Sequence, residues 1–331
     1  MGLLINGQWH DQWYDTSKTD GAFQREDAAI RHWITADGSA GPSGDAGFKA
    51  ESGRYHLYVS LACPWAHRTL IFRELKGLQD HISVSVVSPD MLSQGWEFDT
   101  EHPDPRFRSN GDELFNSRYL HQIYTRHKSD YSGRVTVPVL WDKQRNCIVS
   151  NESSEIIRMF NSAFDQITGN SLDFYPHALR DGIDAINERV YHRVNNGVYK
   201  AGFATAADKY EAAVTTLFAE LDQLDARLAG QRWLVNDSLG QSHLTEADWR
   251  LFTTLVRFDA VYFGHFKCNL QLIRDYPALS RWMKRLQKLP GVMSTVNLDH
   301  IKRHYYFSHD TINPTRIVPI GPRAGFLPGE L

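Results

Sequence analysis

The stretch from Arg54 to Gly77 constrains the fold most strongly, because a strand pattern runs through a cysteine directly into a helix pattern. Between Arg54 and Ser60 every second side chain is apolar, as in a half-buried strand. Pro64 suits the first position of a helix, where a missing N–H costs no hydrogen bond, and Gly77 suits the helix end. We therefore predict that Cys63 is the N-cap residue of this helix.

An N-cap position changes the chemistry of the Cys63 thiol. The first N–H groups of a helix have no intrahelical partners, and the helix dipole is positive at that end. Both effects favour the thiolate, so the pKa of Cys63 should fall below the ordinary value of about 8.5. The alternative is a small buried hydrophobic residue, which is the usual fate of a free cysteine. The strand–Cys–Pro–helix context favours the nucleophile.

Cysteine usage indicates a reducing compartment. The chain holds three cysteines, Cys63, Cys147 and Cys268, a number too small and odd for a disulfide framework. Ala66 stands where the second cysteine of a Cys-x-x-Cys motif would be. The predicted site therefore has a single thiol, and an external thiol must complete any redox cycle. We expect a cytoplasmic protein.

Length and charge limit the possible partners. A chain of 331 residues is long enough for two domains, and its net charge of −3 gives no reason to expect nucleic acid or an anionic membrane as a partner. No apolar run approaches the 18 residues of a membrane span. The first ten residues resemble no secretory signal, and Asn6 occupies the Ser/Thr position of a myristoylation motif.

The pattern of elements divides the chain. Residues 1–50 read as an extended arm with docking points at Phe23–Arg25 and at residues 31–33. Residues 51–164 mix strand and helix patterns, among them a helix over 113–127, a strand over 135–141 and a loop over 88–111.

Helical patterns replace the strands after Phe164. We predict an all-helical domain over 172–300, in which Thr245 is the N-cap of one helix, and a C-terminal tail over 301–331.

The run from Cys63 to Arg68, Cys-Pro-Trp-Ala-His-Arg, resembles the active-site signature of the Xi-class glutathione transferases, the glutathionyl-hydroquinone reductases. The resemblance extends from Trp9 to Pro314. It implies the glutathione transferase fold, an α/β thioredoxin-like domain followed by an all-α domain, here with extended N- and C-terminal arms. It also implies glutathione as co-substrate and a homodimer.

Three further residues are predicted to bind glutathione with Cys63. Pro138 interrupts a strand pattern, which indicates an edge strand or a special geometry, and the resemblance implies a cis bond that leaves the backbone of Val137 to pair with the tripeptide. Glu152 and Ser153 begin a helix, where N–H groups and a hydroxyl suit a carboxylate and Glu152 suits an ammonium group. The alternative is a plain helix cap by Asn151 or Ser153.

The remaining site residues come from the resemblance alone. Trp96 and Arg134 would complete the glutathione contacts, although Trp96 could instead anchor its loop and Arg134 could be a solvated turn residue. Tyr199 would be the catalytic acid, and Tyr262 and Tyr305 would help to lower the pKa of the cysteine. Simple aromatic packing is the alternative for each tyrosine.

Motifs for other chemistries are missing from the sequence. His300 and His304 have a spacing that a metal could use, but neither a His-Glu-x-x-His motif nor a cysteine pair accompanies them, so we expect a surface or supporting role and no metal. Glycine-rich nucleotide motifs and Gly-x-Ser-x-Gly are also missing, which leaves nucleotide cofactors and serine hydrolysis unsupported.

The resemblance, together with the single thiol predicted at Cys63, implies an enzyme that reduces glutathionyl-hydroquinones through a Cys63–glutathione mixed disulfide, which a second glutathione resolves. An omega-like thioltransferase or dehydroascorbate reductase is the enzymatic alternative. A transferase-like scaffold that only binds ligands is the non-enzymatic one, and it would have no need of a cysteine at the helix start.

Overall fold

The computed structural model describes residues 2–322, which divide into two compact units. Among the described residues, unit 1 comprises residues 2–13, Glu26–Leu172 and Ser294–His304, and unit 2 comprises Tyr14–Arg25, Asp173–Met293 and residues 305–322. The final residues of the predicted C-terminal tail, 323–331, lie outside the described range. Residues 301–308 of that predicted tail are helical, because apolar Ile301 and Tyr305 face inward one turn apart.

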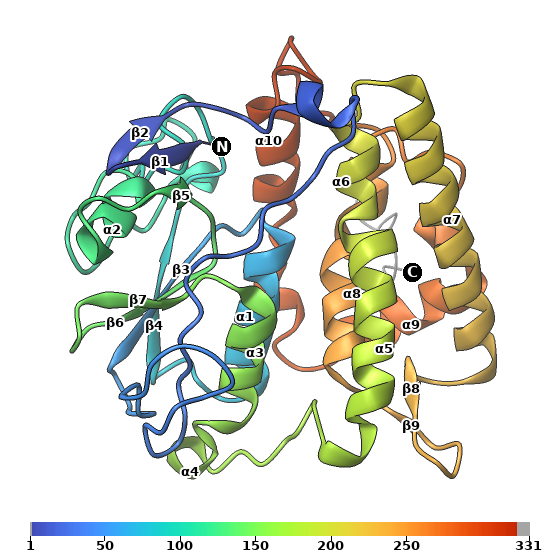
Figure 1. The fold of residues 1–331 in the computed structure, drawn as a ribbon. Helices are drawn as coiled ribbons and strands as arrows, with labels where there is room; N and C mark the ends of the chain where they lie inside the picture. Colours follow the sequence, from blue (N-terminus) through green and yellow to red (C-terminus); the bar gives the residue numbers. More distant parts are fainter. Residues whose placement is uncertain (1, 323–331) are drawn as a thin grey trace. The chain divides into compact units, whose positions relative to one another are not determined.

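Unit 1 is built on a four-stranded sheet in the order β4-β3-β6-β7, with β3 and β4 parallel and the other pairs antiparallel. Leu57 in β3 pairs with Val84 and Leu140, and its side chain is fully buried. Helices α1 and α3 lie side by side on one face of the sheet (Figure 1). The elements of this part are β3 (Tyr55–Val59), α1 (Pro64–Leu75), β4 (Ile82–Val86), α2 (Leu120–His127), β6 (Val139–Asp142), β7 (Cys147–Ser150), α3 (Ser153–Ser162) and α4 (Asp165–Thr168).

Two predicted elements of unit 1 are longer than the observed ones. The helix predicted over 113–127 begins only at Leu120, because the Asp112 carboxylate accepts the N–H groups of Leu114 and Ser117 and holds a turn there. The strand predicted over 135–141 begins at Val139, after Pro138, which has no N–H to donate to a sheet.

The N-terminal arm contributes to both units. Strands β1 (Leu3–Ile5) and β2 (Gln8–His10) form a hairpin whose turn places Asn6 and Gly7 at positive φ, and β1 also pairs with β5 (Gly133–Arg134). The segment Tyr14–Arg25, which includes the 3₁₀ turn η1 (Thr16–Thr19), belongs to unit 2.

Unit 2 is helical, with one short hairpin. Thr245 is the N-cap of α8, as predicted, and its N–H donates to the Asp248 carboxylate at 3.0 Å. Burial raises the pKa of Asp248 to about 6. The main elements are α5 (Arg180–Val190), the π-helical turn η4 (Tyr191–Asn195), α6 (Gly197–Gly202), α7 (Ala207–Gly230), β8 (Val235–Asn236), β9 (Ser242–His243), α8 (Glu246–Arg257), the π-helical turn η5 (Phe258–Tyr262) and α9 (Pro277–Gln287); α10 (Leu298–Ser308) begins in unit 1 and ends in unit 2.

None of the helices described within residues 2–322 combines the length and the apolar character that a membrane crossing requires.

Candidate functional site

Cys63 occupies the N-cap position of α1, as the sequence predicts. Its backbone is extended (φ −76°, ψ 124°), Pro64 follows as the first helical residue, and the N–H of His67 donates to the Cys63 carbonyl at 3.0 Å. The side chain is partly exposed. Strand β3 ends at Val59 and α1 begins at Pro64, so Cys63 lies in the short turn that connects the strand to the helix.

The sulfur of Cys63 lies against the segment that precedes β6. Cys63 Sγ is 3.6 Å from the carbonyl oxygen of Val137, to which the thiol donates. The Val137–Pro138 peptide bond is cis, as the resemblance implies. The structure thus brings together Cys63 and Val137, which lie 74 residues apart in the sequence.

The start of α3 lies in the same unit, and Glu152 is its N-cap residue. The Glu152 carboxylate accepts hydrogen bonds from the N–H and the hydroxyl of Ser154, at 2.8 and 2.7 Å. A cap here was expected from Asn151 or Ser153 as the alternative to a ligand site, and Glu152 itself provides it. Ser153 Oγ accepts from Arg68 Nη1 at 3.5 Å, which links the start of α3 to α1.

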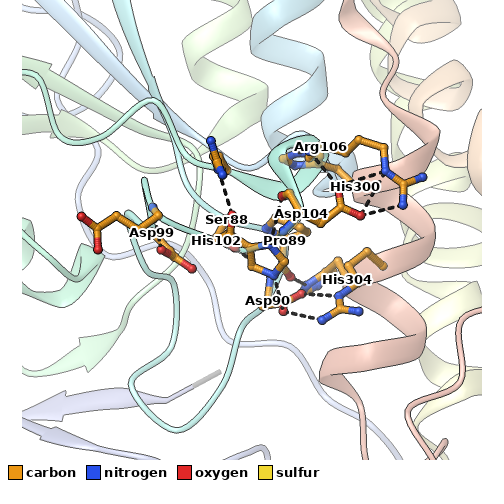
Figure 2. Close-up of polar contacts among 12 residues, drawn as sticks. Ser88, Pro89, Asp90, Asp99, His102, Asp104, Arg106, His300 and His304 are labelled. Carbon is orange, nitrogen blue, oxygen red and sulfur yellow. Dashed lines mark hydrogen bonds and ion pairs between the residues drawn. The ribbon is translucent and has the colours of Figure 1, made fainter.

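Trp96 is buried in the long loop and packs against α10. Its ring stacks on that of His304 with centroids 4.7 Å apart and planes at 26°. Close by, the Asp90 carboxylate, labelled in Figure 2, accepts from Arg303 Nε and Nη2, both at 2.7 Å. The alternative of a loop anchor therefore describes the packing of Trp96 in this structure, and the glutathione contact stays a prediction.

His300 and His304 are buried, so of the expected surface or supporting roles the supporting one remains for both. His304 Nδ1 donates to the carbonyl of Pro89 at 3.0 Å, and His300 Nε2 donates to the carbonyl of Arg106 at 2.8 Å (Figure 2). Burial lowers the pKa of His300, which favours the neutral ring. Both rings fasten the 88–111 loop to α10 and so support Trp96.

Arg134 is not the solvated turn residue that the sequence left open. It lies in β5, its side chain is 11% exposed, and Nη1 donates to the carbonyl of Gln12 at 2.5 Å. Arg134 Nε lies 3.4 Å from Glu26 Oε1. The guanidinium therefore contacts two parts of the N-terminal arm, and its contact with a glutathione carboxylate stays a prediction.

The three predicted tyrosines lie together in unit 2. The hydroxyl of Tyr305 lies 2.6 Å from that of Tyr199 and 3.0 Å from that of Tyr262. Burial raises the pKa of both Tyr262 and Tyr305 well above 10, so both phenols keep their protons at neutral pH. Tyr199 is 9% exposed, more than either partner. The three phenols form one hydrogen-bonded cluster, in which Tyr199 is the most exposed member.

The other cysteines differ from Cys63 in their surroundings. Burial raises the pKa of Cys147, in β7, and that of the almost fully enclosed Cys268. Across residues 2–322 there is no group of three or more His, Cys, Asp or Glu side chains that could hold a metal ion.

Sequence reasoning did not include two arginines, Arg68 and Arg25, among the site residues, yet both contact predicted site residues. Arg68 is buried, and its guanidinium lies over the Trp65 ring as well as near Ser153. The available signal was its place as the last residue of the Cys-Pro-Trp-Ala-His-Arg run. Arg25 lies over the Tyr199 ring, with Cζ 4.8 Å from the centroid. Its predicted docking position in the arm gave no hint of that partner.

The chain matches two family profiles. "Glutathione S-transferase, N-terminal domain" matches residues 62–163, and "Glutathione S-transferase, C-terminal domain" matches residues 207–285.

Curated relatives match almost end to end. A glutathionyl-hydroquinone reductase of Escherichia coli is 55% identical over 97% of this chain and 95% of the relative. A glutathionyl-hydroquinone reductase of Sphingobium chlorophenolicum is 52% identical over 99% of this chain and 98% of the relative.

Solved structures agree with these matches. The glutathione-bound structure of the E. coli protein superposes with a TM-score of 0.87 and 52% identity, covering 97% of this chain and 96% of that one. The Xi glutathione S-transferase of Phanerochaete chrysosporium superposes with a TM-score of 0.84 and 53% identity, covering 92% and 94%.

Proposed function

Because the chain belongs to the glutathionyl-hydroquinone reductases, the Xi class of the glutathione S-transferase family, we propose that it reduces glutathionyl-hydroquinones at Cys63 with glutathione as co-substrate. The observation that carries this proposal is the thiol at the start of α1, partly exposed and beside the backbone of Val137. A peptide ligand that pairs with Val137 would bring its own sulfur close to Cys63.

The first half of the reaction forms a mixed disulfide. The Cys63 thiolate attacks the sulfur of the glutathionyl group, and the bond between that sulfur and the aromatic carbon breaks. The electron pair of this bond goes to the aromatic carbon, which takes a proton from Tyr199 and leaves as hydroquinone. The two sulfur atoms are oxidised to a disulfide while the aromatic carbon is reduced.

The second half returns the enzyme. A second glutathione, as thiolate, attacks the glutathione sulfur of the mixed disulfide, so glutathione disulfide leaves and the Cys63 thiolate is restored. Ala66 fits this cycle, since a resolving cysteine in the enzyme would make the second glutathione unnecessary. The proton released by the second glutathione balances the one that Tyr199 gave up.

We propose that the hydrogen bonds among Tyr199, Tyr262 and Tyr305 hold Tyr199 in the orientation of a proton donor. If Tyr262 donates to Tyr305 and Tyr305 donates to Tyr199, the Tyr199 proton is directed to the substrate. The high pKa of Tyr262 and Tyr305 supports this direction, because both remain donors. The resemblance also gives these two tyrosines a part in lowering the pKa of Cys63, which we retain in the proposal.

The glutathione moiety is proposed to contact several residues of unit 1. Val137 would pair with the backbone of the tripeptide, and Ser153 with Glu152 would receive the carboxylate and ammonium of the γ-glutamyl group. The buried guanidinium of Arg68 beside Ser153 supports this assignment, since it adds positive charge where a carboxylate would lie. Trp96 and Arg134 are proposed to complete the contacts.

The proposed catalytic cycle and the resemblance also bear on localisation and assembly. A cycle that consumes reduced glutathione and depends on a free thiol needs a reducing compartment, so we place the enzyme in the cytoplasm. We also propose a homodimer, as the resemblance implies, which sedimentation of the purified protein would test.

The decisive experiment compares two substrates and one variant. The wild type should have a kcat/KM for a glutathionyl-hydroquinone at least about tenfold above that for a small glutathione mixed disulfide. Tyr199→Phe should slow release of the arene about 10²-fold and change the KM for the glutathionyl substrate little, because the hydroxyl acts on the leaving carbon. Equal loss in kcat and in glutathione binding would refute the acid role.

A further inference from the structure

The guanidinium of Arg25 contacts the aromatic face of Tyr199. Arg25 Cζ lies 4.8 Å from the centre of the Tyr199 ring, and Arg25 Nε donates to Asn196 Oδ1 at 2.9 Å. Asn196 comes one residue before α6, the helix that carries Tyr199, so the side chain that orients Arg25 and the ring beneath it share one segment. All three residues belong to unit 2.

We infer that Arg25 is a positioning residue that makes Tyr199 a stronger proton donor. The inference rests on the proposed role of Tyr199 as the acid. A cation over an aromatic face is attracted to the ring, and the attraction grows when the ring carries a phenolate. Arg25 therefore lowers the cost of the charge that Tyr199 acquires when it gives its proton to the aromatic carbon.

The neighbouring packing keeps Arg25 and Tyr199 together. Phe23, two residues before Arg25, is buried, and its ring lies 6.4 Å from that of Tyr199 and 5.5 Å from that of Phe203. The Thr205 N–H also donates to the carbonyl of Gly21 at 3.0 Å, which fixes the same arm segment to the end of the α6 region. These contacts hold the Arg25 guanidinium in a fixed position over the Tyr199 ring.

Other titratable groups surround Tyr199 in unit 2. The Tyr305 hydroxyl, from α10, hydrogen-bonds to the Tyr199 hydroxyl and also to that of Tyr262, from η5. The charge of Arg257, from α8, acts on Tyr262 and Tyr305. The rings of His265 and His309 pack against Tyr305. Arg25 differs from all of these because its charge lies over the Tyr199 ring itself.

The test is the pH profile of kcat for a glutathionyl-hydroquinone in Arg25→Gln. Loss of the cation makes the Tyr199 phenolate less stable, so we expect kcat to fall about tenfold while KM changes less than about twofold. The alkaline limb of the profile, where Tyr199 loses its proton, should move to higher pH. Arg25→Lys keeps the charge and should restore part of the rate.

Lys18 supplies a matched control, because it is a cation in the same arm segment with an 80% exposed side chain. Lys18→Gln should leave both kcat and the alkaline limb at wild-type values. A fall in kcat in Arg25→Gln with an unmoved alkaline limb would assign Arg25 a merely structural role and overturn the inference.

The double variant separates this inference from the proposed function. If Tyr199→Phe has wild-type kcat, the acid role itself fails. If Tyr199→Phe is slow, adding Arg25→Gln to it should cause no further loss, because the group through which Arg25 acts is gone. An additional tenfold loss in that background would show that Arg25 acts by another route.

Discussion

Helices α1 and α3 begin with similar backbones and use their first turns differently. Both N-cap residues are extended, with φ −76° and ψ 124° at Cys63 and φ −102° and ψ 108° at Glu152. Glu152 folds back and caps its own helix, whereas the sulfur of Cys63 makes no cap bond and contacts the carbonyl of Val137 instead. The N-cap side chain of α3 therefore bonds within its own helix, whereas the N-cap sulfur of α1 contacts another segment.

This difference has a chemical meaning. At α1 the first-turn N–H groups and the helix dipole can stabilise a thiolate without competition from a capping carboxylate. At α3 the Glu152 carboxylate already occupies one N–H group, so an incoming carboxylate must rely more on the Ser153 hydroxyl and on Arg68. The first helix start suits a nucleophile, and the second suits a zwitterionic head group.

Substitution of Cys63 is the strongest test of the difference between the two helix starts. Cys63→Ser and Cys63→Ala should each lower kcat by roughly 10³-fold or more, because an alcohol or a methyl group cannot attack the glutathione sulfur. Thermal unfolding should remain close to that of the wild type. Near-normal turnover in either variant would contradict the mechanism.

Cys147→Ser is the matched control, because burial raises the pKa of Cys147 and should leave its thiol unreactive. It should keep full activity. In the wild type, iodoacetamide should label Cys63 at pH 7 at least about tenfold faster than Cys147. Equal labelling of both thiols would remove the distinction between a helix-start thiol and a strand thiol.

Two variants of Glu152 separate its capping of α3 from its proposed role in binding glutathione. Glu152→Ala removes the cap and the charge, so it should destabilise the fold by about 1 kcal/mol and also raise the KM for glutathione. Glu152→Gln keeps an oxygen that can cap α3 but loses the charge, so it should unfold near the wild-type temperature and raise KM about tenfold. A wild-type KM in Glu152→Gln would leave this residue with capping alone.

The smallest effect is expected at Ser154. Ser154→Ala removes the hydroxyl that donates to Glu152 at 2.7 Å and keeps the backbone N–H bond at 2.8 Å. Because one of two hydrogen bonds that orient the carboxylate is lost, KM for glutathione should rise about twofold, with an unfolding change below about 1 kcal/mol. Steady-state kinetics with varied glutathione and thermal unfolding would measure these changes, and an unchanged KM would mean that the N–H alone orients Glu152.

The predictable part of the fold was encoded in local patterns. The Cys63–Pro64 helix start and the Thr245 cap depend on residues next to each other in the sequence, and the structure has both. The helix predicted over 113–127 starts late because Asp112 binds backbone N–H groups that periodicity alone assigns to a helix. Local spacing carries no information about such a competitor.

The rest of the site depends on contacts between distant residues. The burial of Trp96 under His304 and the position of Arg25 over Tyr199 join segments that sequence spacing cannot relate. Resemblance to a family identified Trp96 and Tyr199 as candidates, and only coordinates revealed what lies against them. Physical reasoning alone identified Cys63, the strand interruption at Pro138 and the start of α3, whereas the role of Val137 came from the resemblance.

Strand β1 has a consequence for synthesis of the chain. Leu3 and Leu4 pair with Arg134 and Gly133, so during synthesis β1 acquires this partner only after the intervening part of unit 1 has been translated. Until then the β1–β2 hairpin is a two-stranded ribbon, which is marginal in water. While the intervening segment is being translated, β1 presents an unpaired strand edge, which makes early binding by a chaperone advantageous.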